Sequence, residues 1–375
     1  MSGIYIHIPF CRQRCFYCDF YKTLNTSLVS KYISALKKEI RQRKNYLENE
    51  PVETVYFGGG TPSVLSEGEL NEIINFLHTE FNILPDAEIT FEANPDDLTV
   101  EYLKQIYRAG INRLSIGIQS FHDEYLKTMN RRHTAIQAIN AVENAVKTGI
   151  ENISVDLIYG LPQLTDSHWE ASLKQVFQLP VNHLSAYHLT YHEGTDFYNR
   201  LKNGTLKELN ETESISQFTI LVEATEKQGF EQYEISNFAK TKRYSKHNTS
   251  YWMGKKYLGL GPSAHSFNGI ARGWNVADAE KYIAAFTSGD SCFEEEILTE
   301  NDKYNEYILT RIRTVWGVSL NFIKNSFGEE KAQHFIKNIE QYKATNLVVN
   351  NTGIYTLSKK GLFVSDEIMT DLMII

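Results

Sequence analysis

The chain has 375 residues, 42% of them hydrophobic, and a net charge of −8 at pH 7. This length allows one large core and a smaller second one. The acidic balance argues against a general nucleic-acid binder, which would carry a basic excess, and no run of about 18 apolar residues predicts a membrane span.

Strand-like and helix-like stretches alternate over the first half of the chain. Six strands are predicted, at residues 5–8, 53–57, 88–91, 113–117, 153–158 and 183–188. The intervening helices are predicted at residues 28–47, from Ser66 onward with a capping box, 99–110, 123–129, 135–147 and 166–177. Six such units predict a parallel sheet, either curled into a partial (β/α)6 TIM-like barrel or open and doubly wound. In both architectures chemistry is expected at the carboxyl ends of the strands.

The pattern changes after about residue 195. A helix at 213–227 and a strand at 230–235 are followed by an irregular aromatic segment to residue 274. Helices at 305–314, 322–326 and 331–342, a hairpin of 347–349 with 354–356, and a last helix near Gly361 predict a small winged-helix-like α+β domain. The expected domains are 1–195, 196–296 and 297–375.

Cys11, Cys15 and Cys18 follow the first strand at the spacing C-x3-C-x2-C. Thiolates are soft ligands, and three from one loop suit a [4Fe-4S] cluster with one iron open to S-adenosylmethionine (SAM). Zinc and purely structural cysteines are the alternatives, although zinc usually takes four protein ligands and Cys292 is remote. Clustered free cysteines and a strand in place of a signal peptide predict a reducing, cytoplasmic location.

Polar residues occur at or near the ends of several predicted strands. Gly58-Gly59-Gly60-Thr61 follows the second strand, where glycines let the backbone approach a ligand or simply form a tight turn. Glu92, Gln119 and Asp156 lie in or after otherwise apolar strands, so each needs a partner there. Hydroxyl or ammonium groups of a ligand would supply these partners, and Arg131 would suit a carboxylate. Structural hydrogen bonds and ion pairs are the alternative for each residue.

A second motif, His247-Asn248-Thr249-Ser250-Tyr251-Trp252, combines an imidazole with two aromatic side chains. A histidine can ligate heme iron, and the aromatic residues could line a porphyrin face. A lone histidine beside aromatic residues is more often a hydrogen-bonded core residue. His265, in Ala264-His265-Ser266-Phe267, is a second candidate with the same alternative.

The segment H-I-P-F-C-x3-C-x-Y-C resembles the cluster loop of the radical SAM family. Within it the chain is similar to oxygen-independent coproporphyrinogen III oxidase and its relative, the heme chaperone HemW. The resemblance implies a [4Fe-4S] cluster on Cys11, Cys15 and Cys18, and a heme ligand at His247. It implies a SAM pocket formed by Tyr5, Tyr17, Gly59, Gly60, Thr61, Glu92, Gln119, Arg131 and Asp156, with Arg132 as a substitute for Arg131 and Thr190 as a weaker candidate.

Two departures from the oxidase pattern favour the chaperone. The oxidase resemblance calls for a fourth cysteine where this chain has Phe20, and for an N-terminal extension where only four residues precede Tyr5. We therefore expect a protein that binds heme and transfers it to an acceptor protein, which could be membrane-associated, without oxidase activity. The alternative is an oxidoreductase of porphyrin biosynthesis that decarboxylates coproporphyrinogen III. A third interpretation is a radical SAM enzyme with an unrelated substrate.

Overall fold

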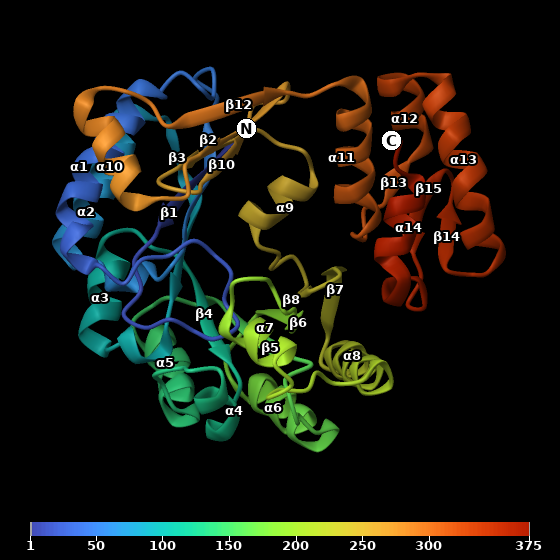
Figure 1. The fold of residues 1–375 in the computed structure, drawn as a ribbon, viewed down its shortest axis with the longest axis horizontal. Coiled ribbons are helices and arrows are strands. Elements are labelled where there is room, and N and C mark those ends of the chain that lie inside the picture. Colours follow the sequence, from blue (N-terminus) through green and yellow to red (C-terminus); the bar gives the residue numbers. More distant parts are fainter. Residues whose placement is uncertain (1, 375) are drawn as a thin grey trace.

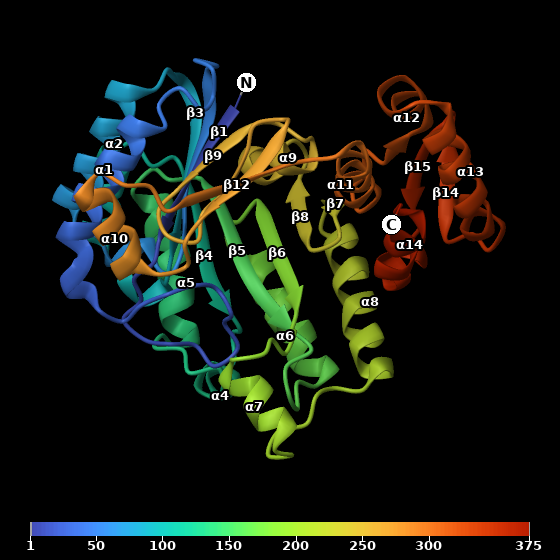
Figure 2. The same ribbon diagram turned by 45° about the horizontal axis from the view of Figure 1, so that its top comes forward.

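The computed structural model describes residues 2–374, and its first six strands lie side by side in chain order. They are β1 (Ser2–Ile8), β2 (Val52–Gly59), β3 (Ile83–Ala93), β4 (Arg113–Gln119), β5 (Asn152–Tyr159) and β6 (His183–His188), and every neighbouring pair is parallel. An order without reversal puts successive right-handed crossovers on one side of the sheet, whereas a doubly wound sheet reverses its order. The predicted partial (β/α)6 barrel is therefore confirmed, and the doubly wound alternative is wrong (Figures 1 and 2).

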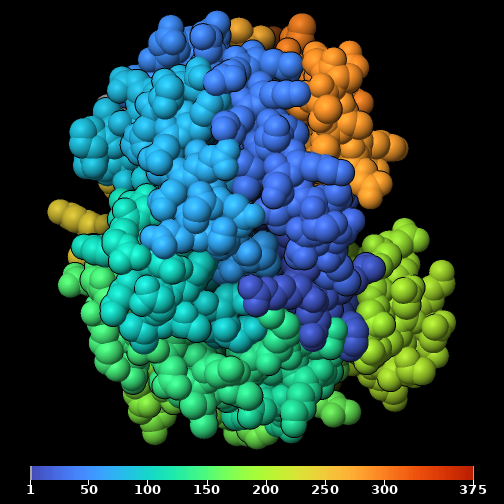
Figure 3. Space-filling view, turned by 90° about the vertical axis from the view of Figure 1, so that its left-hand side faces the viewer, coloured from blue at the N-terminus to red at the C-terminus, as the bar shows by residue number. Residues whose placement is uncertain are grey.

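Helices cover the outer face of this sheet. They are α1 (Val29–Gln42), α2 (Glu67–Glu80), α3 (Val100–Arg108), α4 (Asp123–Thr128), α5 (Ala135–Lys147) and α6 (Asp166–Gln178). Figure 3 views this face, where the helices of the first half of the chain, from blue to green, form one continuous surface. The Ser66–Glu69 capping box is present at α2, and Thr99 caps α3. Strand alternation separates the two faces, because Ile4, Ile6 and Ile8 are fully buried in the helix-side core.

The segment predicted as irregular contains short strands, so that prediction was wrong. β7 (Phe230–Glu234) confirms the strand predicted at 230–235, whereas β8 (Asn237–Lys240) was not predicted, and both extend the sheet beyond β6. β9 (Tyr257–Leu260) pairs in parallel with β1, and β10 (His265–Phe267), β11 (Ala271–Asn275) and β12 (Phe293–Ile297) continue from it as antiparallel strands. These strands have three to five residues, so they are too short for alternation to be visible in the sequence.

Four further helices belong to the middle of the chain: α7 (Asp196–Lys202), α8 (Glu211–Lys227), α9 (Lys246–Trp252) and α10 (Ala279–Ser288). α10 packs beside α1, and its orange surface adjoins the blue helices in Figure 3. α9 contacts β1 and β2 on the side of the sheet opposite to those helices. α9 therefore lies at the amino-terminal end of the barrel lumen, which is the polar interior faced by Tyr5, Tyr56 and Glu92.

The last part of the chain has its own hydrophobic core. It contains α11 (Glu300–Ile312), β13 (Val318–Ser319), α12 (Leu320–Phe327), α13 (Glu329–Ala344), β14 (Val348–Asn351), β15 (Ile354–Leu357) and α14 (Ser365–Leu372). The three strands form an antiparallel sheet in the order β13-β15-β14. A helix, a strand, two helices and a hairpin in this order form a winged-helix-like unit, as predicted, and Figure 1 shows it beside the barrel. Arg313 ties it to the barrel through an ion pair with Glu234 at 2.6 Å.

None of the helices formed by residues 2–374 combines the length and the apolar character that a bilayer span requires.

Candidate functional site

The three clustered cysteines lie on the loop that follows β1, and none forms a disulfide. Cys11 is buried, with its sulfur 3.3 Å from Thr61 Oγ1. Arg131 Nη1 donates a hydrogen bond to Cys15 Sγ at 3.3 Å, and the Cys18 amide donates to the Cys15 carbonyl at 3.4 Å. Residues that follow β2 and β4 therefore contact the loop that follows β1, at the carboxyl-terminal edge of the sheet.

The positions of the sulfur atoms discriminate between the two metal sites that the spacing leaves open. Three thiolates on one tetrahedral zinc ion, with bonds of about 2.3 Å, would lie about 3.8 Å apart. The sulfur atoms of Cys11, Cys15 and Cys18 do not all lie within 4.8 Å of one another. Burial raises the pKa of the Cys11 and Cys18 thiols and so disfavours their thiolate forms. A strongly positive group bound between the cysteines is therefore needed to keep three thiolates in this loop. The donor set fits a multi-iron cluster better than a single zinc ion.

Two carboxyl groups face the lumen next to this loop. Glu92 accepts hydrogen bonds from the Tyr56 hydroxyl at 2.7 Å and from the Gly59 amide at 3.2 Å. Burial raises the pKa of Glu92 to about 7, against the effect of the Tyr56 hydrogen bond, and nearby Asp156 raises it further. Burial also raises the pKa of Asp156, to about 6, although Ser115 donates to it at 3.2 Å. Each carboxyl oxygen has a second lone pair, so the pair can accept further hydrogen bonds from a polar ligand.

The glycine segment after β2 packs directly on the start of the cysteine loop. The amides of Gly60 and Thr61 donate to the carbonyl oxygens of Ile8 and Phe10, each at 2.8 Å. A Cβ on Gly60 would lie 2.8 Å from these same two oxygens, which no side chain tolerates without a shift. Gly59 has a φ of 104°, a left-handed conformation that favours glycine. The segment therefore has a structural role, and its contact with a ligand stays a prediction.

Besides the cysteine loop, the Arg131 side chain lies beside Asn94, Gly117 and Gln119. Its Nη2 donates to Asn94 Oδ1 and to the Gly117 carbonyl, both at 2.6 Å. Its buried Nε has no hydrogen-bond partner among the described residues. Burial raises the pKa of Tyr17, and the neighbouring Arg131 guanidinium opposes that shift. A Cβ on Gly117 would lie 2.9 Å from Gln119 Nε2 and 3.4 Å from Arg131 Nη2, so these two polar side chains meet over this glycine.

The two weaker predicted candidates lie apart from this group. Arg132 forms ion pairs with Asp96 at 2.8 Å and with Asp97 at 3.0 Å. Thr190 is exposed beyond the end of β6. Among the residues predicted for the SAM pocket, Thr61 and Arg131 thus contact cysteines of the loop, whereas Arg132 is paired with Asp96 and Asp97.

His247 lies at the opposite, amino-terminal end of the lumen. Its Nδ1 is 2.7 Å from Thr54 Oγ1 and its Nε2 is 2.7 Å from the Tyr251 hydroxyl. The ring stacks on Tyr56 with centroids 5.0 Å apart, and only 1% of the residue is exposed. Burial lowers the pKa of His247 to about 3, so the ring is neutral at pH 7. In this conformation both ring nitrogens are occupied, and the ligand role predicted for His247 stays a prediction.

A cleft of about 900 Å³ opens between the barrel and the winged-helix-like unit. Tyr5 and His7 of β1 lie on its wall, and Phe20 and Tyr21 of the cysteine loop border it. The other walls are formed by α9, by β9 to β11, by α11 and by α12. Aromatic side chains predominate, and they include Tyr251, Trp252, Tyr257, Phe267, Tyr307, Phe322 and Phe327.

Several residues of this cleft were not predicted from the sequence, among them Tyr21, Met253, Arg272 and Arg311. They come from segments far apart in the chain, and no spacing within one segment marks them. His265, which was named only as a second candidate, lies on the wall of the cleft.

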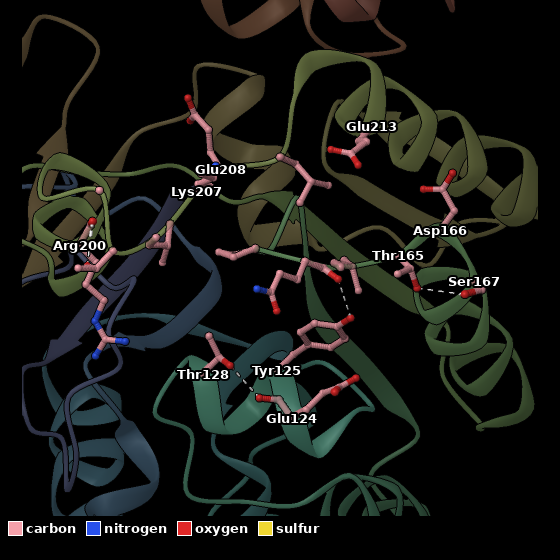
Figure 4. Close-up of a pocket in the computed structure, with 17 residues that line it drawn as sticks. Glu124, Tyr125, Thr128, Thr165, Asp166, Ser167, Arg200, Lys207, Glu208 and Glu213 are labelled. Atoms are coloured by element: carbon pink, nitrogen blue, oxygen red, sulfur yellow. Dashed lines mark hydrogen bonds between the residues drawn. The ribbon is translucent and has the colours of Figure 1, made fainter.

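A second cavity, of about 1140 Å³, lies on the far side of the barrel, between α4, the loop after β5 and the segment after α7 (Figure 4). Charged side chains line it, including Glu124, Asp166, Arg200 and Glu213, and none of the predicted site residues is among them. Figure 4 shows these side chains dispersed around the opening. The cavity therefore offers no large aromatic face. Glu124 on its wall lies together with His122 and His168, and one ligand atom of each of these three residues lies within 4.8 Å of the other two.

Comparisons with known proteins cover nearly the whole chain. The model of the Radical SAM superfamily matches residues 5–176, and that of the HemN C-terminal domain matches residues 298–364. The heme chaperone HemW of Bacillus subtilis (strain 168) is 34% identical over 372 residues, which are 98% of each chain. The heme chaperone HemW of Lactococcus lactis subsp. lactis is 31% identical over 98% of this chain and 96% of its own.

The solved structure of coproporphyrinogen III oxidase (HemN) from Escherichia coli, a radical SAM enzyme, is similar in fold. It has a TM-score of 0.87 and covers 99% of this chain and 90% of its own, with 22% sequence identity. At this identity the likeness concerns the fold alone.

Proposed function

Because the chain belongs to the heme chaperone HemW family of radical SAM proteins, we propose that it binds heme and transfers it to an acceptor protein. The observation that carries this proposal is the aromatic cleft of about 900 Å³ beside the cysteine loop. Heme is a flat apolar macrocycle with two carboxylates, and it suits aromatic walls with cationic side chains at their edge. Arg311 supplies such a cation.

The second part of the proposal concerns the cofactors. Cys11, Cys15 and Cys18 would hold a [4Fe-4S] cluster, which supplies single electrons when bound. Tyr5, Tyr17, the Gly59-Gly60-Thr61 segment, Glu92, Gln119, Arg131 and Asp156 would hold SAM. The paired carboxyl groups can accept hydrogen bonds from its hydroxyl or ammonium groups, and Arg131 can donate to its carboxylate. Free thiols in one loop support a reducing, cytoplasmic location.

We also propose domain boundaries at 1–195, 196–296 and 297–375. The separate core that begins at Tyr304 supports the last of them. The middle portion would supply α9 and most of the strands on one wall of the cleft.

The alternative function is oxidative decarboxylation of coproporphyrinogen III, and the SAM-type residues around the cysteine loop are the observation in its favour. Phe20 argues against it, because 66% of this side chain is exposed at the edge of the cleft, at the position where the oxidase pattern has a cysteine. Incubation with coproporphyrinogen III, SAM and a reductant under anaerobic conditions discriminates between the two functions. Formation of protoporphyrinogen would establish the oxidase.

The chaperone proposal is tested by titrating the reconstituted protein with hemin under anaerobic conditions and following the Soret absorbance. We expect saturable binding near one hemin per chain. Mixing the loaded protein with apomyoglobin, a general heme acceptor, should then transfer the hemin. A linear, unsaturable absorbance increase in the titration would refute the proposal.

A further inference from the structure

We propose that His265 is the iron ligand of the heme cleft, and that His247 acts on this cleft through Tyr251 as a positioning residue. This inference rests on the proposed heme-binding function and assigns the residues that carry it.

The contacts of His247 leave neither ring nitrogen free for a direct bond to iron. Both ring nitrogens are within 2.7 Å of a hydroxyl group, one from Thr54 on β2 and one from Tyr251 one helical turn away. The backbone amide of His247 also donates to Glu88 at 3.1 Å, so main chain and side chain are both fixed. The Tyr56 ring covers one face of the imidazole. A porphyrin could reach this nitrogen only by displacing groups that close the lumen.

His265 presents the opposite arrangement. It is the first residue of β10, its side chain is exposed on the cleft wall, and neither ring nitrogen has a hydrogen-bond partner among residues 2–374. The Trp274 ring lies 6.3 Å away, centre to centre, on the neighbouring strand. His265 therefore offers a free imidazole to the cleft.

The backbone beneath His265 is held rigidly. A Cβ on Gly259 would lie 1.9 Å from the His265 carbonyl oxygen, so β9 and β10 can pack this closely only with glycine at that position. The Ser266 hydroxyl bonds to the amide and carbonyl of Gly259, at 2.9 and 3.3 Å. An imidazole on such a strand has a fixed direction, which favours a defined ligand geometry.

The cleft also has a cation suited to a heme propionate. Arg311 contacts Met253 Sδ at 2.6 Å and lies 5.8 Å from the centre of the Tyr307 ring. Within residues 2–374 it has no carboxylate partner, whereas Arg272 is paired with Glu306. A propionate would supply the missing countercharge of Arg311.

The link from His247 to the cleft runs through one hydrogen bond. The Tyr251 hydroxyl bonds to His247 Nε2, and the Tyr251 ring packs edge-on against Tyr257, with centroids 4.5 Å apart. Both tyrosines line the cleft, and the Tyr257 hydroxyl accepts a hydrogen bond from Arg272 at 3.1 Å. Loss of His247 would release Tyr251 from its place on the wall. A buried histidine would thereby affect heme binding without touching iron.

The test is an anaerobic hemin titration of the full-length, cluster-reconstituted chain, with optical and electron paramagnetic resonance spectra of the ferric complex. The variants are His265→Ala, His265→Met, His247→Ala and, as a matched control, His78→Ala, an exposed histidine on α2. We expect His265→Ala to bind hemin about tenfold or more weakly. It should lose the imidazole-ligated spectrum, which added free imidazole should restore.

His265→Met should give a thioether-ligated spectrum, which a merely structural role would not produce. His247→Ala should bind more weakly but keep the imidazole-ligated spectrum, and His78→Ala should match the wild type. An unchanged spectrum in His265→Ala, or loss of the imidazole signature in His247→Ala alone, would overturn the ligand assignment while leaving the chaperone function intact. Absence of saturable binding in the wild type would overturn both.

Discussion

The guanidinium of Arg131 donates a hydrogen bond to the sulfur of Cys15 at 3.3 Å. Its other terminal nitrogen bonds to Asn94 and to the Gly117 carbonyl, so one side chain joins the cysteine loop to the ends of β3 and β4. Arg132, the next residue, is paired with Asp96 and Asp97 instead. Two adjacent arginines thus provide a test residue and its control.

Replacing Arg131 by Ala should weaken SAM binding by about tenfold or more, because a buried cation next to the predicted SAM site would be lost. Cluster content should be retained, since the three cysteines are unchanged. Equilibrium dialysis with SAM and iron analysis measure the two effects. Arg132→Ala should leave SAM affinity unchanged, and the reverse result for the two variants would move the SAM assignment to Arg132.

The fourth cysteine should have no part in holding iron. Cys292 lies near the start of β12, and its carbonyl accepts a hydrogen bond from the Val276 amide at 3.1 Å, away from the cysteine loop. Cys292→Ala should therefore keep the iron content of the wild type, whereas Cys18→Ala should lose the cluster. Iron and sulfide analysis after anaerobic reconstitution provides the measurement. Loss of iron in Cys292→Ala would show that the ligand set is incomplete.

The buried carboxyl group of Glu92 should make stability depend on pH. Burial raises its folded-state pKa from an ordinary value near 4.5 to about 7. The folded state therefore binds the proton more tightly, and the free energy of unfolding should fall as pH rises from about 4.5 to 7. Glu92→Gln removes this titration. Between pH 5 and pH 8 its free energy of unfolding should therefore change by about 1–3 kcal/mol less than that of the wild type.

Urea denaturation of the cluster-free protein at pH 5 and at pH 8 measures this difference. Asp156, whose pKa burial raises to about 6, contributes in the same direction and makes Asp156→Asn a second informative variant. Equal pH dependence in wild type and Glu92→Gln would contradict the raised pKa.

Gly60 should be essential for the cysteine loop. Gly60→Ala places a methyl group 2.8 Å from the Ile8 and Phe10 carbonyl oxygens, so the start of the loop must move. We expect incomplete cluster loading and a loss of stability of about 1–3 kcal/mol from this overpacking. Gly68→Ala in α2 meets no atom within 4 Å and should stabilise the helix by about 0.5–1 kcal/mol. Iron content and unfolding midpoints of the two variants would reveal any departure from this order.

Local sequence patterns predicted the strands and helices of the barrel well, because the residues that begin and end each helix lie directly beside it in the sequence. The helix Ala135–Lys147 and the strand His183–His188 were predicted to the residue, with Thr134 capping the helix and Gly149 following it. The parallel strand β9 was missed because it has only four residues, and its pairing with β1 joins segments about 250 residues apart. Pairing between strands this far apart in the chain produces no periodic pattern in the sequence.

The residues of the candidate site also divide into those that a local sequence pattern reveals and those that only the folded chain brings together. The cysteine spacing was visible because all three residues lie in one loop, and the Tyr251 partner of His247 lies one helical turn away. Its other partner, Thr54, comes from β2, and no local pattern connects the two. The aromatic cleft draws on six or more segments, so its existence and the free imidazole of His265 required the folded chain.

The pairing of β1 with β9 has a consequence for the order in which this protein is made. β1 carries the cysteine loop, and Gly3 to Ile6 need residues 257–260 as their second neighbour in the sheet. Since synthesis proceeds from the N-terminus, β1 leaves the ribosome long before the strand β9 with which it pairs. The cysteine loop would then follow a strand that lacks one of its two neighbours until residue 260 has emerged. If this loop holds the proposed cluster, iron delivery should be productive only after most of the chain has been translated.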